Sequence, residues 1–252
     1  MSISLPVELD AIAEELDYER GRLIYEGAGG NEVRRSILPG GVRVITEKMP
    51  GTRGVSIGFW VGVGSRDEAP GMLGSTHFLE HLLFKGTGTR TALDIASSFD
   101  AVGGESNALT AKEHTCYYAR VLDDDAPMAV DVITDMVTNA LLDPAHLEQE
   151  RGVILEEIAM DQDDPTDVAF ENFAEQLMGA NPLGRPIGGT PEEIQAVPRD
   201  AVWEHYKRYY TPDRLVISAA GSLEHSTMVR LVLESLTRYG WDLREGVAPA
   251  PR

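Results

Sequence analysis

The feature that most constrains the fold is a pair of short runs, VRRSIL and VRVITEKM, joined by the tripeptide PGG. Apolar, β-branched runs on either side of a tight turn predict an antiparallel β-hairpin. The segment VSIGFWVGVGS predicts a third strand, and ESNALTA with TCYYARVL predicts a second hairpin across Lys112 and Glu113. The segment RLVISAAG, from Arg214, predicts the last strand.

Helices are predicted between and after these strands. Helical patterns cover residues 72–85 and 91–101, and a last one runs from about Leu223 to Tyr239. Three further helix starts place a capping residue before a proline, at Asp143-Pro144, Asp164-Pro165 and Thr190-Pro191. Because strands occur as hairpins and helices in runs, we expect an α+β fold with helices packed on one face of a mostly antiparallel sheet.

One folded domain is expected over residues 32–239. Residues 1–31, which end in GAGGN, are predicted to be an acidic and poorly ordered N-terminal arm outside the core. Residues 240–252 are predicted to be a C-terminal tail or linker stub.

Composition restricts the class of partner. With 22 Lys and Arg against 41 Asp and Glu, the net charge of -19 argues against a nucleic-acid partner. The charge either steers cations or basic peptides or serves solubility alone. The sequence predicts no membrane span and no signal peptide, and a single cysteine excludes an internal disulfide framework, so we expect a cytoplasmic protein.

The segment HFLEHLLFKGT places three ionisable side chains in an apolar helical run. On a helix, His77 and His81 lie one turn apart and Glu80 lies between them on the same face. Two imidazoles at this spacing can bind zinc, while a carboxylate that does not bind the metal accepts a proton from water. HxxEH is therefore a hydrolase signature, the inverse of HExxH. The alternative is a pair of core histidines hydrogen-bonded to Glu80.

A catalytic zinc needs a third protein ligand, and the segment LEQERGVILEEIAMD offers carboxylates. On a helix, Glu150, Glu157 and Asp161 share the stripe of Leu147, Val153, Ile154 and Ile158. A buried carboxylate is costly unless it is paired or bound to metal. We therefore predict Glu157 as the third ligand, and Glu150 as a residue that orients a ligand or shares the proton traffic. The alternative is a solvated acidic face.

These segments resemble the pitrilysin-type inverzincins, the M16 metallopeptidases, and most of all their processing-peptidase branch. HFLEHLLFKGT and ERGVILEEI carry the likeness, together with NALTAKEHTCYYARVL, LGRPIGGT and YTPDRLVISAAG in the same order. The resemblance implies a processing-peptidase or LuxS-like metallohydrolase domain with one Zn²⁺ per chain. It also implies that His77, His81 and Glu157 bind the zinc, that Glu80 is the general base and that Glu150 is the supporting acid.

The resemblance further implies that an extended peptide adds to the sheet edge at Asn107, Ala108, Leu109 and Thr110. An ordinary core hairpin is the alternative there. Zinc-activated water would be the nucleophile of a metalloendopeptidase that hydrolyses peptides or unfolded segments, basic ones being favoured by the charge. The competing hypotheses are a non-catalytic peptide-binding or scaffold subunit and a hydrolase of small amides.

Members of this branch usually contain a second, homologous half that closes a chamber over the zinc. The sequence ends at Arg252, where a linker would begin. We therefore expect a second half, supplied by a different chain in a heterodimer or by another copy in a homodimer, unless the sequence is a truncated form.

Histidines outside the motif are not expected to bind metal. His146, His205 and His225 are isolated on helix or loop patterns and are predicted to be surface or capping residues.

Overall fold

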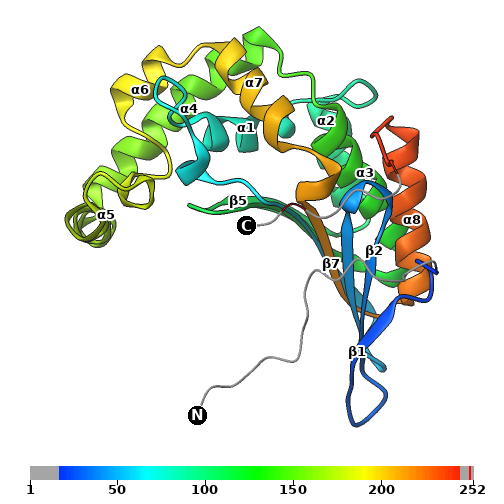
Figure 1. The fold of residues 1–252 in the computed structure, drawn as a ribbon. Coiled ribbons are helices and arrows are strands. Elements are labelled where there is room, and N and C mark those ends of the chain that lie inside the picture. Colours follow the sequence, from blue (N-terminus) through cyan, green and yellow to red (C-terminus); the bar gives the residue numbers. More distant parts are fainter. Residues whose placement is uncertain (1–16, 245–249, 251–252) are drawn as a thin grey trace, which may run out of the picture.

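A seven-stranded sheet, strongly curved, forms the centre of the molecule (Figure 1). The structure is a computed structural model, and it describes residues 17–244 and residue 250. The strand order is β1-β2-β3-β7-β4-β6-β5. The strands are β1 (Arg22–Glu26), β2 (Glu32–Ile37), β3 (Arg43–Lys48), β4 (Gly54–Val61), β5 (Glu105–Thr110), β6 (Thr115–Leu122) and β7 (Leu215–Gly221).

The pairing of these strands confirms an α+β fold with a mostly antiparallel sheet. Only the pair β3 and β7 is parallel among the described strands, because β7 returns from the helical region to insert between β3 and β4. The PGG turn does join β2 to β3 in register, and β5 pairs with β6 as a hairpin. β5 has one neighbour in the sheet and therefore leaves one edge unpaired.

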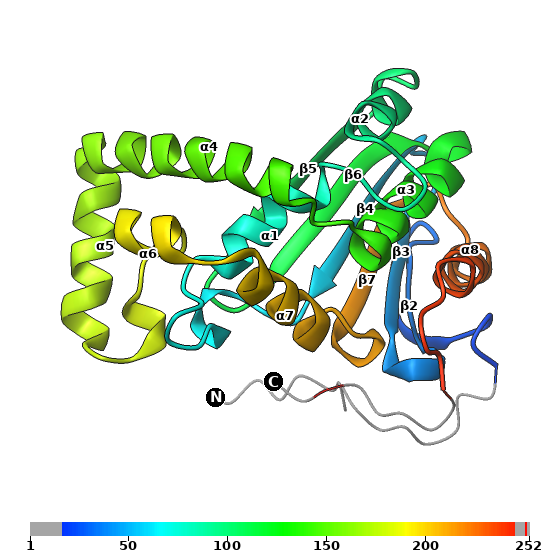
Figure 2. The ribbon, with the colours of Figure 1, turned by 90° about the horizontal axis from the view of Figure 1, so that it is seen from above.

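Helices cover one face of the sheet and extend beyond its β5 end (Figures 1 and 2). Helices α3 and α8 pack against the central strands, and α1 and α2 pack against β5. Helices α4, α5 and α6 form the arm at the left of both views, and α7 packs against α1. The helices are α1 (Ser75–Leu83), α2 (Ala92–Asp100), α3 (Ala126–Asn139), α4 (Pro144–Asp163), α5 (Pro165–Met178), α6 (Pro191–Ala196), α7 (Arg199–Tyr209) and α8 (His225–Arg238).

The predicted helix starts are correct because each uses local capping chemistry. Asp143 and Asp164 accept hydrogen bonds from the backbone two residues later, with proline at the first helical position. Thr190 and Glu193 form the expected capping box at the start of α6. The Asp143 cap fixes the residue at which α4, the helix that packs against α1, begins.

Both predicted domain boundaries need correction. Residues 22–26 do not belong to a poorly ordered arm, because they form the edge strand β1 on β2, although their side chains are exposed as expected. Trp241 and Leu243 are partly buried against the core, and the N–H of Gly40 donates to the carbonyl oxygen of Arg244 at 2.7 Å. The domain therefore includes residues 22–26 and 241–244. Residues 1–16 of the predicted arm lie outside the described residues.

Within the described part of the chain, no helix is both long and apolar enough to cross a bilayer.

Candidate metal centre

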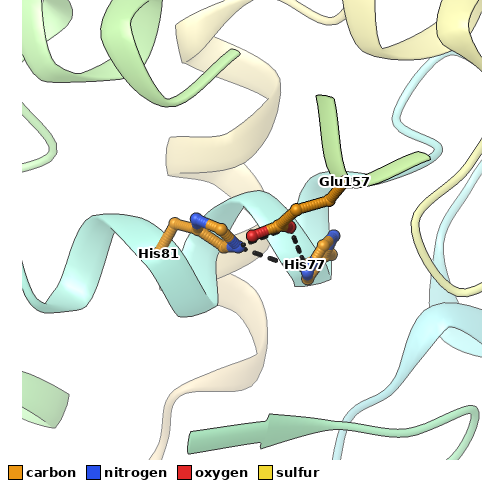
Figure 3. A group of neighbouring side chains, drawn as sticks. All are labelled: His77, His81 and Glu157. Atoms are coloured by element: carbon orange, nitrogen blue, oxygen red, sulfur yellow. Dashed lines mark hydrogen bonds and ion pairs between the residues drawn. The ribbon is translucent and has the colours of Figure 1, made fainter. Parts of the chain in front are cut away.

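Helix α1 directs His77 and His81 to the same side, and the carboxylate of Glu157 reaches them from α4 (Figure 3). His77 and His81 lie four residues apart, one turn of the helix. The opposite side of α1 is buried in the core through Phe78, Leu79 and Leu82. Packing of α1 against α4 therefore brings together two imidazoles and one carboxylate that are far apart in the sequence.

The spacing of these three groups fits a zinc ion. The two Nε2 atoms of His77 and His81 lie 3.3 Å apart, and Glu157 Oε2 lies 3.3 Å from His81 Nε2 and 3.7 Å from His77 Nε2. A tetrahedral zinc with bonds of about 2.0–2.1 Å separates its ligand atoms by about 3.3–3.4 Å. Two histidines and one glutamate are also a ligand set that catalytic zinc uses, with the fourth position open.

Glu150 holds the far side of the His81 ring. The N–H at His81 Nδ1 donates to Glu150 Oε2 at 3.1 Å, and Lys85 Nζ lies 2.8 Å from Glu150 Oε1. The Glu150 side chain is only 3% exposed. A proton at Nδ1 leaves Nε2 unprotonated, which is the form that binds a metal. The position of Glu150 thus suits the orientation of a ligand.

Glu80 lies on α1 between the two histidines and contacts the sheet. Its Oε2 accepts a short hydrogen bond from the hydroxyl of Thr110, the last residue of β5. Since β5 is an edge strand of the sheet, this contact links α1 to that edge strand. Thr110 itself is buried, so its side chain faces Glu80 and not the outside of the sheet.

Burial and the neighbouring His81 lower the pKa of His77. The neutral imidazole is therefore favoured. This is the protonation state that a metal ligand requires.

Helix α4 presents the predicted stripe only in part. Leu147, Glu150 and Ile154 are buried and Glu157 is half-buried, as the helical phase predicted. Val153 and Asp161 are exposed, so their assignment to the buried stripe was wrong. Val153 lies beside the buried Ile154, so the packed face is narrower than the predicted stripe. Asp161 lies toward the C-terminal end of α4, which extends beyond α1 (Figure 2).

Two residues near the centre were not predicted. Lys85 follows His81 by one helical turn, a spacing that could have indicated its role beside Glu150. Glu68 accepts hydrogen bonds from the backbone at the start of α1, and its position in the sequence carries no comparable signal.

His205 and His225 are buried, which corrects their assignment to the surface. Their side chains meet hydroxyl groups: His205 Nε2 lies 3.0 Å from Thr76 Oγ1, and the His225 ring lies between Ser36 and Thr46, at 2.8 Å from each hydroxyl. Burial lowers the pKa of each histidine to about 4. Neither residue belongs to the one group of possible metal ligands found among the described residues.

Comparison with known proteins agrees with this fold. The model of the Insulinase (Peptidase family M16) family matches residues 43–191, and the chain belongs to this family. It is 50% identical over 222 residues to an uncharacterized zinc protease of Streptomyces coelicolor. The aligned region covers 88% of this chain and 48% of that relative. It is 35% identical over 211 residues to the probable mitochondrial-processing peptidase subunit beta of Arabidopsis thaliana, covering 84% of this chain and 40% of that relative.

Solved structures share the fold at low sequence identity. Pitrilysin superposes with a TM-score of 0.78 at 22% identity, over 90% of this chain and 25% of that protein. A protease from Helicobacter pylori gives a TM-score of 0.78 at 22% identity, over 88% of this chain and 54% of that protein. The chain spans about half the length of curated relatives such as the Streptomyces coelicolor protein.

Proposed function

We propose that this chain is the zinc-binding half of a metalloendopeptidase that cleaves peptides or unfolded segments. The observation that carries the proposal is the triangle of ligand atoms from His77, His81 and Glu157, with sides of 3.3–3.7 Å. Glu80, on the same helix as the two histidines, is not part of this group. The names of the relatives, which are zinc proteases, support zinc as the cofactor. One zinc per chain is proposed because the described residues contain one group of possible metal ligands.

In the proposed reaction His77, His81 and Glu157 hold the zinc, and Glu150 fixes the His81 ring. Zinc, when bound, acidifies a water molecule and polarises the peptide carbonyl. Glu80 accepts the proton of the attacking water and passes it to the leaving amine, with Thr110 holding its carboxylate toward the substrate edge.

The unpaired edge of β5 is proposed to bind the substrate backbone. The N–H of Ala108 donates to the side chain of its neighbour, Asn107 Oδ1, at 2.8 Å, and not to β6. A peptide that adds to this edge can replace that local bond with a strand-to-strand bond. Leu109 is 50% exposed and is free to contact a substrate side chain.

Basic peptides are the favoured substrates. The net charge is -19, and the sequence from 152 to 184, which covers most of α4 and all of α5, contains no Lys or Arg. An acidic surface near the catalytic groups raises the local concentration of basic peptides.

A second homologous half is proposed to complete the site. The support is the length of the relatives, about twice the matched region. The half can come from the same longer chain, another copy or a different chain. The cytoplasmic location stays a prediction.

The test is hydrolysis of a quenched-fluorescent library of unstructured peptides, neutral and basic, by the zinc-loaded chain. The control is Glu80→Gln, which removes the base and spares the zinc ligands. Cleavage by the unmodified chain and not by the variant supports the proposal. Equal cleavage by both would show that Glu80 is not the general base.

If neither cleaves while both hold zinc, either a second half is required or the chain is a non-catalytic subunit. Repeating the assay with the second half of the Streptomyces relative added separates these outcomes.

A further inference from the structure

Helix α1, which carries both histidine ligands, begins without a local cap. Its N-cap residue, Gly74, has no side chain, and the first turn contains no acidic residue. Gly74 has φ = 85°, and a Cβ atom there would lie 2.3 Å from Ile194 Cδ1. No capping side chain therefore fits at this position, and the first N–H groups of α1 need an acceptor from elsewhere.

Glu68 supplies that acceptor. Its Oε2 accepts from the N–H of Gly74 at 2.8 Å, and its Oε1 accepts from the N–H of Thr76 at 2.7 Å. The residue is 5% exposed, and its negative charge lies where the helix dipole is positive. Burial raises the pKa of Glu68 to about 7, although the two N–H groups and Arg185 oppose this shift.

The segment LGRPIGGT holds Glu68 and α1 together. Arg185 Nη1 donates to the carbonyl oxygen of Glu68 at 3.1 Å. Further along the same segment, Gly189 lies against Gly74, and Gly188 lies beside the His77 ring. A Cβ atom on Gly188 would be 3.6 Å from His77 Nδ1.

Thr76 is also held through its side chain. Its hydroxyl lies 3.0 Å from Nε2 of the buried His205 on α7. The residue that precedes His77 is thus fixed through its N–H by Glu68 and through its side chain by His205. A shift of the backbone here moves the His77 ring relative to His81 and Glu157, whose ligand atoms lie within 3.3–3.7 Å of one another.

We propose that Glu68, supported by Arg185, is a positioning residue that sets the geometry of the metal centre by fixing the first turn of α1. The inference rests on the proposed zinc site. It goes beyond the family likeness of the zinc ligands, because Glu68 contacts neither the metal nor the substrate.

The test is Glu68→Gln, which keeps the shape of the side chain and removes its charge and one of its two acceptors. Zinc affinity is measured by competition with a chromophoric chelator, and ligand geometry by the d–d absorption bands of the Co²⁺-loaded protein. We expect affinity to fall about tenfold and the Co²⁺ bands to shift.

The matched control is Thr91→Ala, which removes the hydrogen-bonded cap of α2. It should lower the melting temperature and leave zinc affinity and the Co²⁺ spectrum unchanged. If Glu68→Gln behaves like this control, Glu68 serves stability alone and the proposal is overturned.

A milder variant covers the case in which Glu68→Gln does not fold. Arg185→Met removes the cation beside Glu68 and should weaken zinc binding several-fold, whereas unchanged affinity overturns the proposal.

Zinc binding by the unmodified chain separates this inference from the proposed function. If it binds no zinc, the proposed function fails. If it binds zinc and the variants bind equally well, only the role of Glu68 fails.

Discussion

Two sites of this molecule contain histidine, and the partners of the histidines differ between them. At the candidate metal centre, His77 and His81 face each other and two carboxylates, those of Glu157 and Glu150. Toward the opposite edge of the sheet, His225 at the start of α8 meets only the hydroxyl groups of Ser36 and Thr46 at its two ring nitrogens. Burial lowers the pKa of both His77 and His225, so the neutral form is favoured at each site.

The difference lies in what each site can still bind. Ser36 and Thr46 occupy both ring nitrogens of His225, and Gly21 packs so closely that a Cβ atom there would lie 2.3 Å from its Nε2. At the metal centre, three ligand atoms converge and the Glu157 side chain is 42% exposed. Converging unprotonated nitrogens beside carboxylates attract a cation, whereas a histidine satisfied by hydroxyl groups links elements of the fold.

The largest expected effect tests this distinction directly. His77→Gln should lose zinc on dialysis and with it all peptide hydrolysis, because one of three ligands is gone. His225→Gln should keep stoichiometric zinc and lower the free energy of unfolding by about 1–2 kcal/mol. Metal analysis and urea unfolding measure both. Zinc retained by His77→Gln, or lost by His225→Gln, would contradict the conclusion that the first site binds zinc and the second only links elements of the fold.

The carboxylate beside His81 gives the next effect. Glu150→Gln should weaken zinc binding by about 10–100-fold, because His81 Nδ1 loses a charged acceptor and Lys85 its partner. Glu156→Gln, at an exposed position on the same helix, should leave the affinity unchanged. Chelator competition measures both affinities, and equal values would show that Glu150 does not support the ligand.

Acid should destabilise the fold through the histidines that meet hydroxyl groups. The folded-state pKa of His225 is about 4, below the ordinary value of 6.5, so the unfolded chain binds the proton first as pH falls. The contribution of neutral His225 to the free energy of unfolding is complete above pH 6.5. As the pH falls from 6.5 toward 4, the free energy of unfolding decreases by about 3 kcal/mol through this residue. His205 acts in the same direction.

Urea unfolding of the chelator-treated protein between pH 7 and 4.5 measures this slope. His225→Gln, which does not titrate, should flatten the slope. An identical slope in the variant would mean that other groups control acid stability.

The smallest effect concerns the contact between Glu80 and β5. Thr110→Val should lower kcat by about fivefold, equivalent to about 1 kcal/mol, because Glu80 loses the hydroxyl that orients it. Thr110→Ser keeps the hydroxyl and should retain most of the rate. Zinc content should be normal in both variants, and equal rates would assign Thr110 to packing alone.

Local chemistry explains which elements were predicted correctly. The starts of α4, α5 and α6 depend on Asp or Thr before proline, and the hairpin of β2 and β3 depends on the PGG turn. The strand β1 was missed because its side chains are exposed and show no buried alternation. The parallel pairing of β3 with β7 depends on contacts between distant segments, which no local pattern encodes.

The sequence by itself determined the histidine spacing on α1, the acidic residues of α4 and the Asp143 cap at which α4 begins, because these follow from neighbours within one or two turns. Only the tertiary structure decided that Glu157 meets both histidines, that Glu68 caps α1 and that His205 and His225 are buried. Each of these depends on how helices pack against one another and against the sheet. That packing is set by the whole core, whereas periodicity describes one element at a time.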